Sequence, residues 1–139
     1  MSMRPEKKLA LFAVFIAGLL LLAACGGGTP SIALDLTEFE FGDVNVGEII
    51  SRDVVLSNEG TGTLVIDSVS TSCGCTTAVL EQMSIPAGQS TLLHITFDAG
   101  AHGDVTGFYT RQVFIASNDP AQPEVSVQFS ANVIRGTLP

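Results

Sequence analysis

An alternation of apolar and polar residues that runs from Ile32 to the end of the domain constrains the fold of this chain most strongly. In the segment EVSVQFSANV every second residue is apolar, namely Val125, Val127, Phe129, Ala131 and Val133. A period of two places these side chains on one face of a β-strand. Turn residues interrupt the pattern about every ten positions, and no window after residue 31 keeps a helical period. These features predict an all-β domain over residues 32–135, an immunoglobulin-like antiparallel β-sandwich of about seven strands.

The first strand region contains a change of parity. In SIALDL (31–36), Ile32, Leu34 and Leu36 share one parity, whereas Phe39 and Phe41 occupy the other. Such a change in a half-buried strand predicts a bulge or a switch between sheets near Thr37. The glycine-bounded segment GDVNVG (42–47) predicts the turn that follows.

Residues 1–24 have the composition of a signal peptide. Arg4, Lys7 and Lys8 precede an uninterrupted apolar stretch from Leu9 to Ala24. This stretch is shorter than the roughly 20 residues of a relaxed bilayer span. A short apolar core that ends in small residues predicts a signal helix that is cleaved from the mature protein.

The segment LLAAC, which ends at Cys25, resembles the bacterial lipobox. The resemblance implies that Cys25 becomes the mature N-terminus and carries at least two acyl chains, which is enough for stable anchoring. Residues 25–31 (CGGGTPS) then form a glycine-rich linker. We therefore expect a lipoprotein on the extracytoplasmic side of a bacterial membrane, with the lipid as its membrane contact.

The charge of the mature chain limits its partners. Removal of residues 1–24 leaves thirteen acidic side chains and three arginines, a net charge of about −10. Phosphate binding needs clustered basic side chains, so we expect no nucleic-acid partner. The expected partner is another protein of the cell envelope.

The segment Cys73-Gly74-Cys75 holds the two remaining cysteines and leaves four interpretations open. An oxidising compartment favours a disulfide between them, although alternate residues of a straight strand lie roughly 6.5–7 Å apart, so a kink at Gly74 is needed. The thiols could instead be buried structural side chains. A third interpretation is a Cu(I) or Zn(II) site with His94 as a further ligand, His102 and Met83 being the other candidates. The fourth is disulfide exchange with partner proteins.

Other polar groups predict structural roles. His102 lies near two aspartates in a glycine-rich loop, and we expect this loop to be solvated because no nucleophile is linked to the histidine. The triplet Asn118-Asp119-Pro120 predicts a turn. No catalytic constellation or cofactor motif is found, so we expect a protein that is not an enzyme and has no cofactor.

Four segments in this order resemble the bacterial domain-of-unknown-function family numbered 1573. They are FEFGDVNVGE, VVLSNEGTGTLVIDSVSTSCGCTT, IPAGQSTLLHITFDAG and VFIASNDPAQPEVSVQFSANV. That family is similar to the immunoglobulin-like domains of the hydin, abnormal-spindle and major-sperm-protein kind. The resemblance implies this fold, an envelope location and no established catalytic activity. We expect a binding or structural module of the envelope. The alternative is a small redox or metal-handling protein that uses Cys73 and Cys75.

Overall fold

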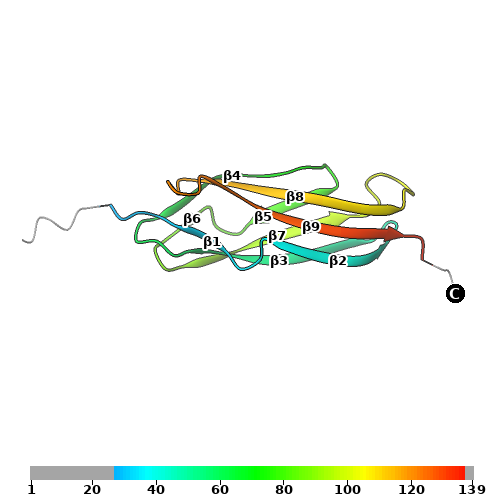
Figure 1. Cartoon of the computed structure of the whole chain (residues 1–139), viewed down its shortest axis with the longest axis horizontal. Coiled ribbons are helices and arrows are strands. Elements are labelled where there is room, and N and C mark those ends of the chain that lie inside the picture. Colours follow the sequence, from blue (N-terminus) through cyan, green and yellow to red (C-terminus); the bar gives the residue numbers. More distant parts are fainter. Residues whose placement is uncertain (1–26, 137–139) are drawn as a thin grey trace, which may run out of the picture.

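A computed structural model of the chain describes residues 27–136. The predicted signal peptide, residues 1–24, and the predicted lipidation site, Cys25, lie outside the described residues. Within them, all regular structure is β, and two sheets pack face to face as a sandwich (Figure 1). No helix in this range is long and apolar enough to cross a membrane. The all-β sandwich prediction is confirmed.

The two sheets share nine strands. The four-stranded sheet has the order β1 (Ile32–Leu34), β3 (Ile49–Asn58), β7 (Ser90–Asp98) and β5 (Thr76–Leu80). The five-stranded sheet has the order β2 (Glu38–Asn45), β9 (Glu124–Ile134), β8 (Gly107–Ser117), β4 (Leu64–Thr71) and β6 (Ser84–Ile85). The structure has more strands than the roughly seven predicted from the sequence. The first predicted strand is split into β1 and β2, and the two-residue β6, which pairs with β4, was not predicted. The sandwich is also not wholly antiparallel, since β2 pairs with β9 in parallel.

The parity change near Thr37 marks a switch between the sheets. β1 pairs with β3 in one sheet, and β2 pairs with β9 in the other. The turn predicted at residues 42–47 begins later than expected. Gly42 instead follows a register shift inside β2, where its φ of 76° suits glycine, and the chain turns at Gly47, with a φ of 81°.

The core fills the space between the sheets. Its largest fully buried side chains are Phe97, Phe129, Leu56, Leu64, Ile85, Leu93, Ile95 and Ile115. Phe129 lies at the centre of an aromatic group, with ring centroids 5.6 Å from Phe39, 5.3 Å from Phe41 and 5.7 Å from Phe97. The alternation predicted for β9 is confirmed from Val127 to Val133, whereas Val125 is only half-buried.

The segment before β1 lies against the turn between β3 and β4. The backbone of Thr29 accepts a hydrogen bond from the N–H of Thr61 (2.9 Å), and Ser31 accepts one from Glu59 (2.8 Å). Gly28 and Gly62 approach so closely that a Cβ on either would meet the other's backbone. Part of the predicted linker, from Gly28 onward, is therefore held against the domain.

Candidate functional site

The Cys73-Gly74-Cys75 segment forms the turn that carries the chain from β4 in one sheet to β5 in the other. The two sulfurs form a disulfide, and the Cα atoms lie 5.2 Å apart, within the usual range for a disulfide. The Thr71 hydroxyl lies 3.0 Å from the carbonyl oxygen of Cys73 and 3.1 Å from that of Thr76. The segment is thus a turn and not the straight strand considered from the sequence.

The two cysteines differ in their exposure. Cys75 is 2% exposed and belongs to the hydrophobic core, whereas Cys73 is half-buried at its edge. Gly74 is exposed, its φ is outside the left-handed region, and a Cβ there would meet nothing within 4 Å. The kink expected at Gly74 therefore does not need the conformational freedom of glycine. Its hydrogen side chain leaves the solvent side of the turn open.

Arg111 of β8 approaches the buried sulfur. Its Nε–H donates to Cys75 Sγ at 3.2 Å, and its Nη1 donates to the carbonyl oxygen of Thr110 at 2.8 Å. The guanidinium carbon lies 4.9 Å from the centre of the Tyr109 ring, a cation–π distance. Among residues 27–136 both ion pairs involve His94, so Arg111 has no carboxylate within 4.0 Å. The positive charge is directed at sulfur, a contact that no pattern in the sequence predicts.

His102 approaches the half-exposed sulfur. Its Nε2 lies 3.4 Å from Cys73 Sγ, and its ring is parallel to that of Tyr109 within 7°, with centroids 6.5 Å apart. The loop after β7 that carries His102 was expected to be merely solvated. The structure instead brings this imidazole to a sulfur, because β7 and β8 flank the turn between β4 and β5.

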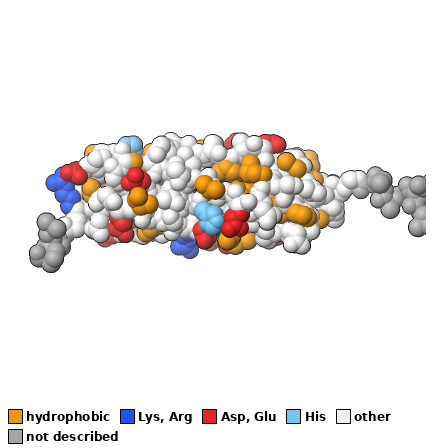
Figure 2. All heavy atoms as spheres, turned by 180° about the vertical axis from the view of Figure 1, so that it is seen from behind, with side chains coloured by type: hydrophobic (Ala, Val, Ile, Leu, Met, Phe, Trp, Pro, Cys, Tyr) orange, Lys and Arg blue, Asp and Glu red, His pale blue; other side chains and the backbone are white. Residues whose placement is uncertain are grey.

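His94, the third residue of the predicted metal site, lies elsewhere. It is on the outer face of the four-stranded sheet, where its Nδ1 bonds Asp53 at 2.6 Å and its Nε2 bonds Glu81 at 3.2 Å. Figure 2 shows one face of the molecule on which a histidine lies beside acidic side chains. These hydrogen bonds, first that of Asp53 and then that of Glu81, raise the pKa of His94 above its ordinary value. The histidine grouped with the cysteines is His102, and His94 is occupied by carboxylates.

A metal ion is a poor match for this group in the disulfide state. The ligand atoms of Cys73, Cys75 and His102 lie within 4.8 Å of one another. Soft metals bind thiolates, and both sulfurs are bonded to each other here. Reduction would free two thiolates, but the guanidinium of Arg111 beside Cys75 would oppose a cation. The arrangement suits chemistry at the sulfur atoms better than metal binding.

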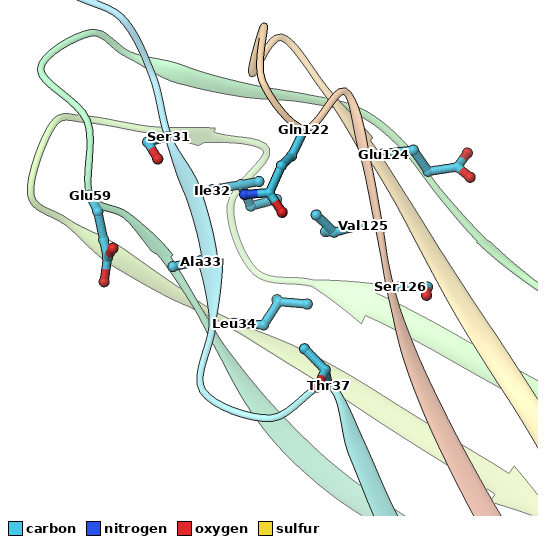
Figure 3. A pocket seen from close by; sticks show the side chains of 10 residues that line it. All are labelled: Ser31, Ile32, Ala33, Leu34, Thr37, Glu59, Gln122, Glu124, Val125 and Ser126. Atoms are coloured by element: carbon cyan, nitrogen blue, oxygen red, sulfur yellow. The ribbon is translucent and has the colours of Figure 1, made fainter.

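A groove lies far from the cysteines, between β1 and the first residues of β9 (Figure 3). Its volume is about 480 Å³. It is lined by Ser31, Ile32, Ala33, Leu34, Thr37, Glu59, Gln122, Glu124, Val125 and Ser126. Figure 3 shows the side chains of Ile32, Leu34 and Val125 between the two strands. The floor of the groove is apolar, and two carboxylates lie at its rim.

The switch from β1 to β2 opens this groove. β2 pairs with β9 only from the Glu38–Gln128 register onward, so the first residues of β9 have no described strand on that side. On either side of β1, Ser31 accepts a backbone hydrogen bond from Glu59 and Asp35 donates one to Val55 of β3. Along an antiparallel strand, the N–H and C=O groups of successive residues point alternately toward and away from the partner strand. The N–H and C=O of Leu34 therefore point away from β3 and toward the groove. Two strand edges therefore border one groove, whose lining combines apolar and polar side chains.

Comparison with known proteins gives a family and a fold. A family model described as "Protein of unknown function (DUF1573)" matches residues 32–133. A crystal structure of a protein of unknown function from Porphyromonas gingivalis W83 is similar, with a TM-score of 0.68 and 27% identity over 80% of this chain. The chain spans half of that protein's length. No curated protein matches the chain.

More distant structures share the fold. PapD-like domain 7 of human CEP192 has a TM-score of 0.60 and 14% identity over 76% of this chain and 87% of that domain. The periplasmic chaperone SfaE has a TM-score of 0.51 and 11% identity, over 78% of this chain and 58% of the chaperone. At such identities the similarity shows an immunoglobulin-like sandwich fold and nothing about ligands.

Proposed function

The chain belongs to the DUF1573 family of proteins of unknown function, and on that premise we propose that it is a lipid-anchored, non-catalytic binding module of the bacterial cell envelope. Its ligand is an extended segment of another envelope protein, held in the groove between β1 and β9. The observation that carries this proposal is the pair of strand edges that border one groove, in which Ile32, Leu34 and Val125 lie among polar side chains. An extended peptide binds such an edge by adding a strand, with its side chains in the neighbouring pocket.

The charge of the groove indicates which side chains the bound partner segment should carry. Glu59 and Glu124 line it, and no lysine or arginine does. Ile32, Leu34 and Val125 offer apolar contacts. The segment that fits has apolar side chains for the floor and a lysine or arginine for the rim, because opposite charges steer association and fix register.

The proposed lipid anchor and the position of the groove would together keep the partner close to the membrane. Ser31 lines the groove, and the chain is held against the domain from Gly28 onward. Gly28 lies three positions after Cys25, and three extended residues reach at most about 10 Å. A lipid on Cys25 would therefore keep the groove near the bilayer surface. The anchor itself rests on the lipobox-like segment LLAAC.

Site-specific crosslinking in the native envelope tests this function. A photoreactive residue replaces Ser126, which lines the groove, and a control replaces Ser70, which is exposed on β4. We expect one discrete protein adduct from position 126 and none from position 70. Charge reversal by Glu59→Lys with Glu124→Lys should weaken that adduct. No adduct at position 126, or the same adduct at position 70, would contradict the proposal.

A further inference from the structure

The Cys73–Cys75 disulfide has one accessible sulfur and one enclosed sulfur. Cys73 is half-buried beside the exposed Gly74, and Cys75 is 2% exposed within the core. A different polar group serves each sulfur: His102 lies beside Cys73, and Arg111 lies beside Cys75. A disulfide that only closed a turn would need neither group.

We propose that this disulfide oxidises a dithiol of a partner protein by thiol–disulfide exchange, with Cys73 as the attacked sulfur and Cys75 as the leaving sulfur. This redox activity goes beyond the binding function proposed above and does not depend on the groove. It takes its direction from the different surroundings of the two sulfurs.

The first step follows from these positions. A partner thiol gives its proton to Nε2 of His102, and the resulting thiolate attacks Cys73 Sγ from the solvent side. A bond forms between the partner sulfur and Cys73 Sγ, the Cys73–Cys75 bond breaks, and the electron pair passes to Cys75 Sγ. Attack on Cys75 Sγ would instead require a partner sulfur to enter the core. The step therefore requires contact with Cys73 alone.

Arg111 stabilises the product of this step. The departing Cys75 thiolate keeps the Nε–H of Arg111 at 3.2 Å and has the Thr76 hydroxyl at 3.8 Å. Hydrogen bonds to an ionised group are stronger than those to a neutral one, so the guanidinium favours the reduced state over the disulfide. Stabilisation of the reduced form makes a disulfide a stronger oxidant. This is the reason for assigning the oxidising direction.

The second step completes the exchange. The second thiolate of the partner attacks the partner's own sulfur in the mixed disulfide, and the bond to Cys73 breaks. Cys73 leaves as a thiolate and accepts a hydrogen bond from the Cys75 N–H, whose nitrogen lies 3.0 Å from Cys73 Sγ in the structure. The thiolate then takes up the proton that His102 received from the partner in the first step. Two electrons pass from the partner dithiol to Cys73 and Cys75. The partner becomes a disulfide and its second proton goes to solvent.

Full-chain variants that keep only one of the two domain cysteines, Cys73 or Cys75, test which sulfur is attacked. Each is extracted in detergent, reduced, incubated with oxidised glutathione and measured by intact mass. We expect Cys75→Ser, which keeps Cys73, to gain one glutathione rapidly. We expect Cys73→Ser, which keeps the enclosed Cys75, to gain glutathione only after unfolding. Equal labelling of the two folded variants, or labelling of Cys75 alone, would overturn the assignment.

The rate at which reduced glutathione opens the native disulfide tests the two polar groups. We expect Arg111→Gln to slow this reaction about tenfold or more, the scale of one lost hydrogen bond to a charged group. His102→Gln, in an exposed loop whose change should spare the fold, should also slow it. Arg52→Gln is the matched control, because Arg52 lies 5.2 Å from the Phe39 ring centre and not at a sulfur. It should react as the wild type does.

Three results would overturn the proposal. The first is a wild-type reaction rate in both Arg111→Gln and His102→Gln. The second is a disulfide that glutathione reduces only when the protein unfolds, which would make it purely structural. The third is a reduced protein that binds one Cu(I) or Zn(II) through His102 so tightly that glutathione exchange stops. None of these results bears on crosslinking at Ser126, so the two proposals can fail separately.

Discussion

Asp119 links two distant parts of the chain although the sequence suggests only a local turn. Its carboxylate is 2% exposed and accepts N–H bonds from Ala121 (2.8 Å) and Gln122 (3.1 Å) within its own turn. It also accepts the N–H of Ile32 at 2.8 Å, at the start of β1. The backbone N–H of Ile32 is the main reason that the pKa of Asp119 lies below its ordinary value, with Ala121 and Gln122 adding to it against the effect of burial.

Asp119→Asn should therefore lower stability at neutral pH and alter its acid dependence. Because the folded pKa is depressed, Asp119 contributes stability above its ordinary pKa of 3.8, and this contribution is lost as the pH falls through the folded value. Thermal melts from neutral pH to about pH 3 should show a smaller acid loss in the variant. Asp67→Asn, at an exposed position of β4, is the control. A variant as stable as the control at neutral pH would contradict this role.

Two glycines should respond oppositely to alanine. The Cβ added by Gly74→Ala would contact no neighbour, and the φ of this residue is outside the left-handed region. The substitution should therefore stabilise the fold by about 0.4–1 kcal/mol, because it restricts the unfolded chain. Gly62→Ala places its Cβ against the carbonyl oxygen of Gly28 and should cost about 1–3 kcal/mol. Urea unfolding measures both values. A destabilised Gly74→Ala would show that the turn needs glycine after all.

At the scale of elements, His94 links three strands on the outer face of one sheet. It lies on β7, Asp53 is its cross-strand partner on β3, and Glu81 directly follows β5. The carboxylates raise the pKa of His94 above its ordinary value of 6.5. Protonated His94 thus favours the folded state, and its contribution is complete below the ordinary value and is lost as the pH rises through the folded value.

The difference in melting temperature between wild type and His94→Gln should therefore depend on pH. We expect the wild type to be the more stable protein near pH 5.5 and the difference to shrink by about pH 8.5. Added salt should reduce the difference at low pH, because the three side chains are solvent-exposed. A difference that is constant across this range would assign His94 a packing role only.

The aromatic group joins β2, β7 and β9 into one core. Phe129 is fully buried among Phe39, Phe41 and Phe97. Phe129→Ala should cost about 3–5 kcal/mol in the free energy of unfolding, since it removes a large side chain and leaves a cavity. Phe108→Ala is the matched control, because Phe108 is 70% exposed. Equal losses in denaturant unfolding would contradict the assigned core.

Alternation predicted most of the elements because one face of each sheet is buried. Leu93, Ile95 and Phe97 are buried as expected. The switch between sheets predicted near Thr37 is also present, since β1 and β2 belong to different sheets. The two-residue β6 was missed because two residues carry no period. The parallel pairing of β2 was missed as well, because alternation shows which face is buried but not which strand is the neighbour.

The environment of the cysteines could be predicted only in part. The compartment and the adjacent cysteines suggested a disulfide, and the structure contains that bond. Arg111 and His102 reach the sulfurs from β8 and from the loop before it, 36 and 29 residues away in the chain. No spacing rule covers such contacts, which depend on the order of strands in two sheets. The alternation correctly placed His94 outward, but it could not name the carboxylates that bind it.

At the scale of the whole molecule, the two candidate sites lie toward opposite ends of the sandwich. The groove is next to Ser31, where the chain enters the domain. The loop that carries His102 lies at the end where the chain leaves, and Asp104 in that loop accepts a hydrogen bond from Arg135 (Figure 1). Strands of eleven residues such as β8 and β9 extend over about 35 Å. A lipid on Cys25 would thus hold the groove at the bilayer and direct the disulfide away from it.

This orientation depends on the lipid, and Cys25→Ser tests it. The lipobox-like segment predicts that the wild type incorporates labelled palmitate and sediments with membranes, and that Cys25→Ser loses the label. Cys73→Ser, which removes a cysteine from the domain, should keep it. With the lipid in place, a membrane-impermeant thiol reagent added to spheroplasts after reduction should label Cys73, because that sulfur would face away from the bilayer. Continued palmitate labelling of Cys25→Ser, or Cys73 that reacts only after the membrane is permeabilised, would contradict the anchor and the extracytoplasmic location respectively.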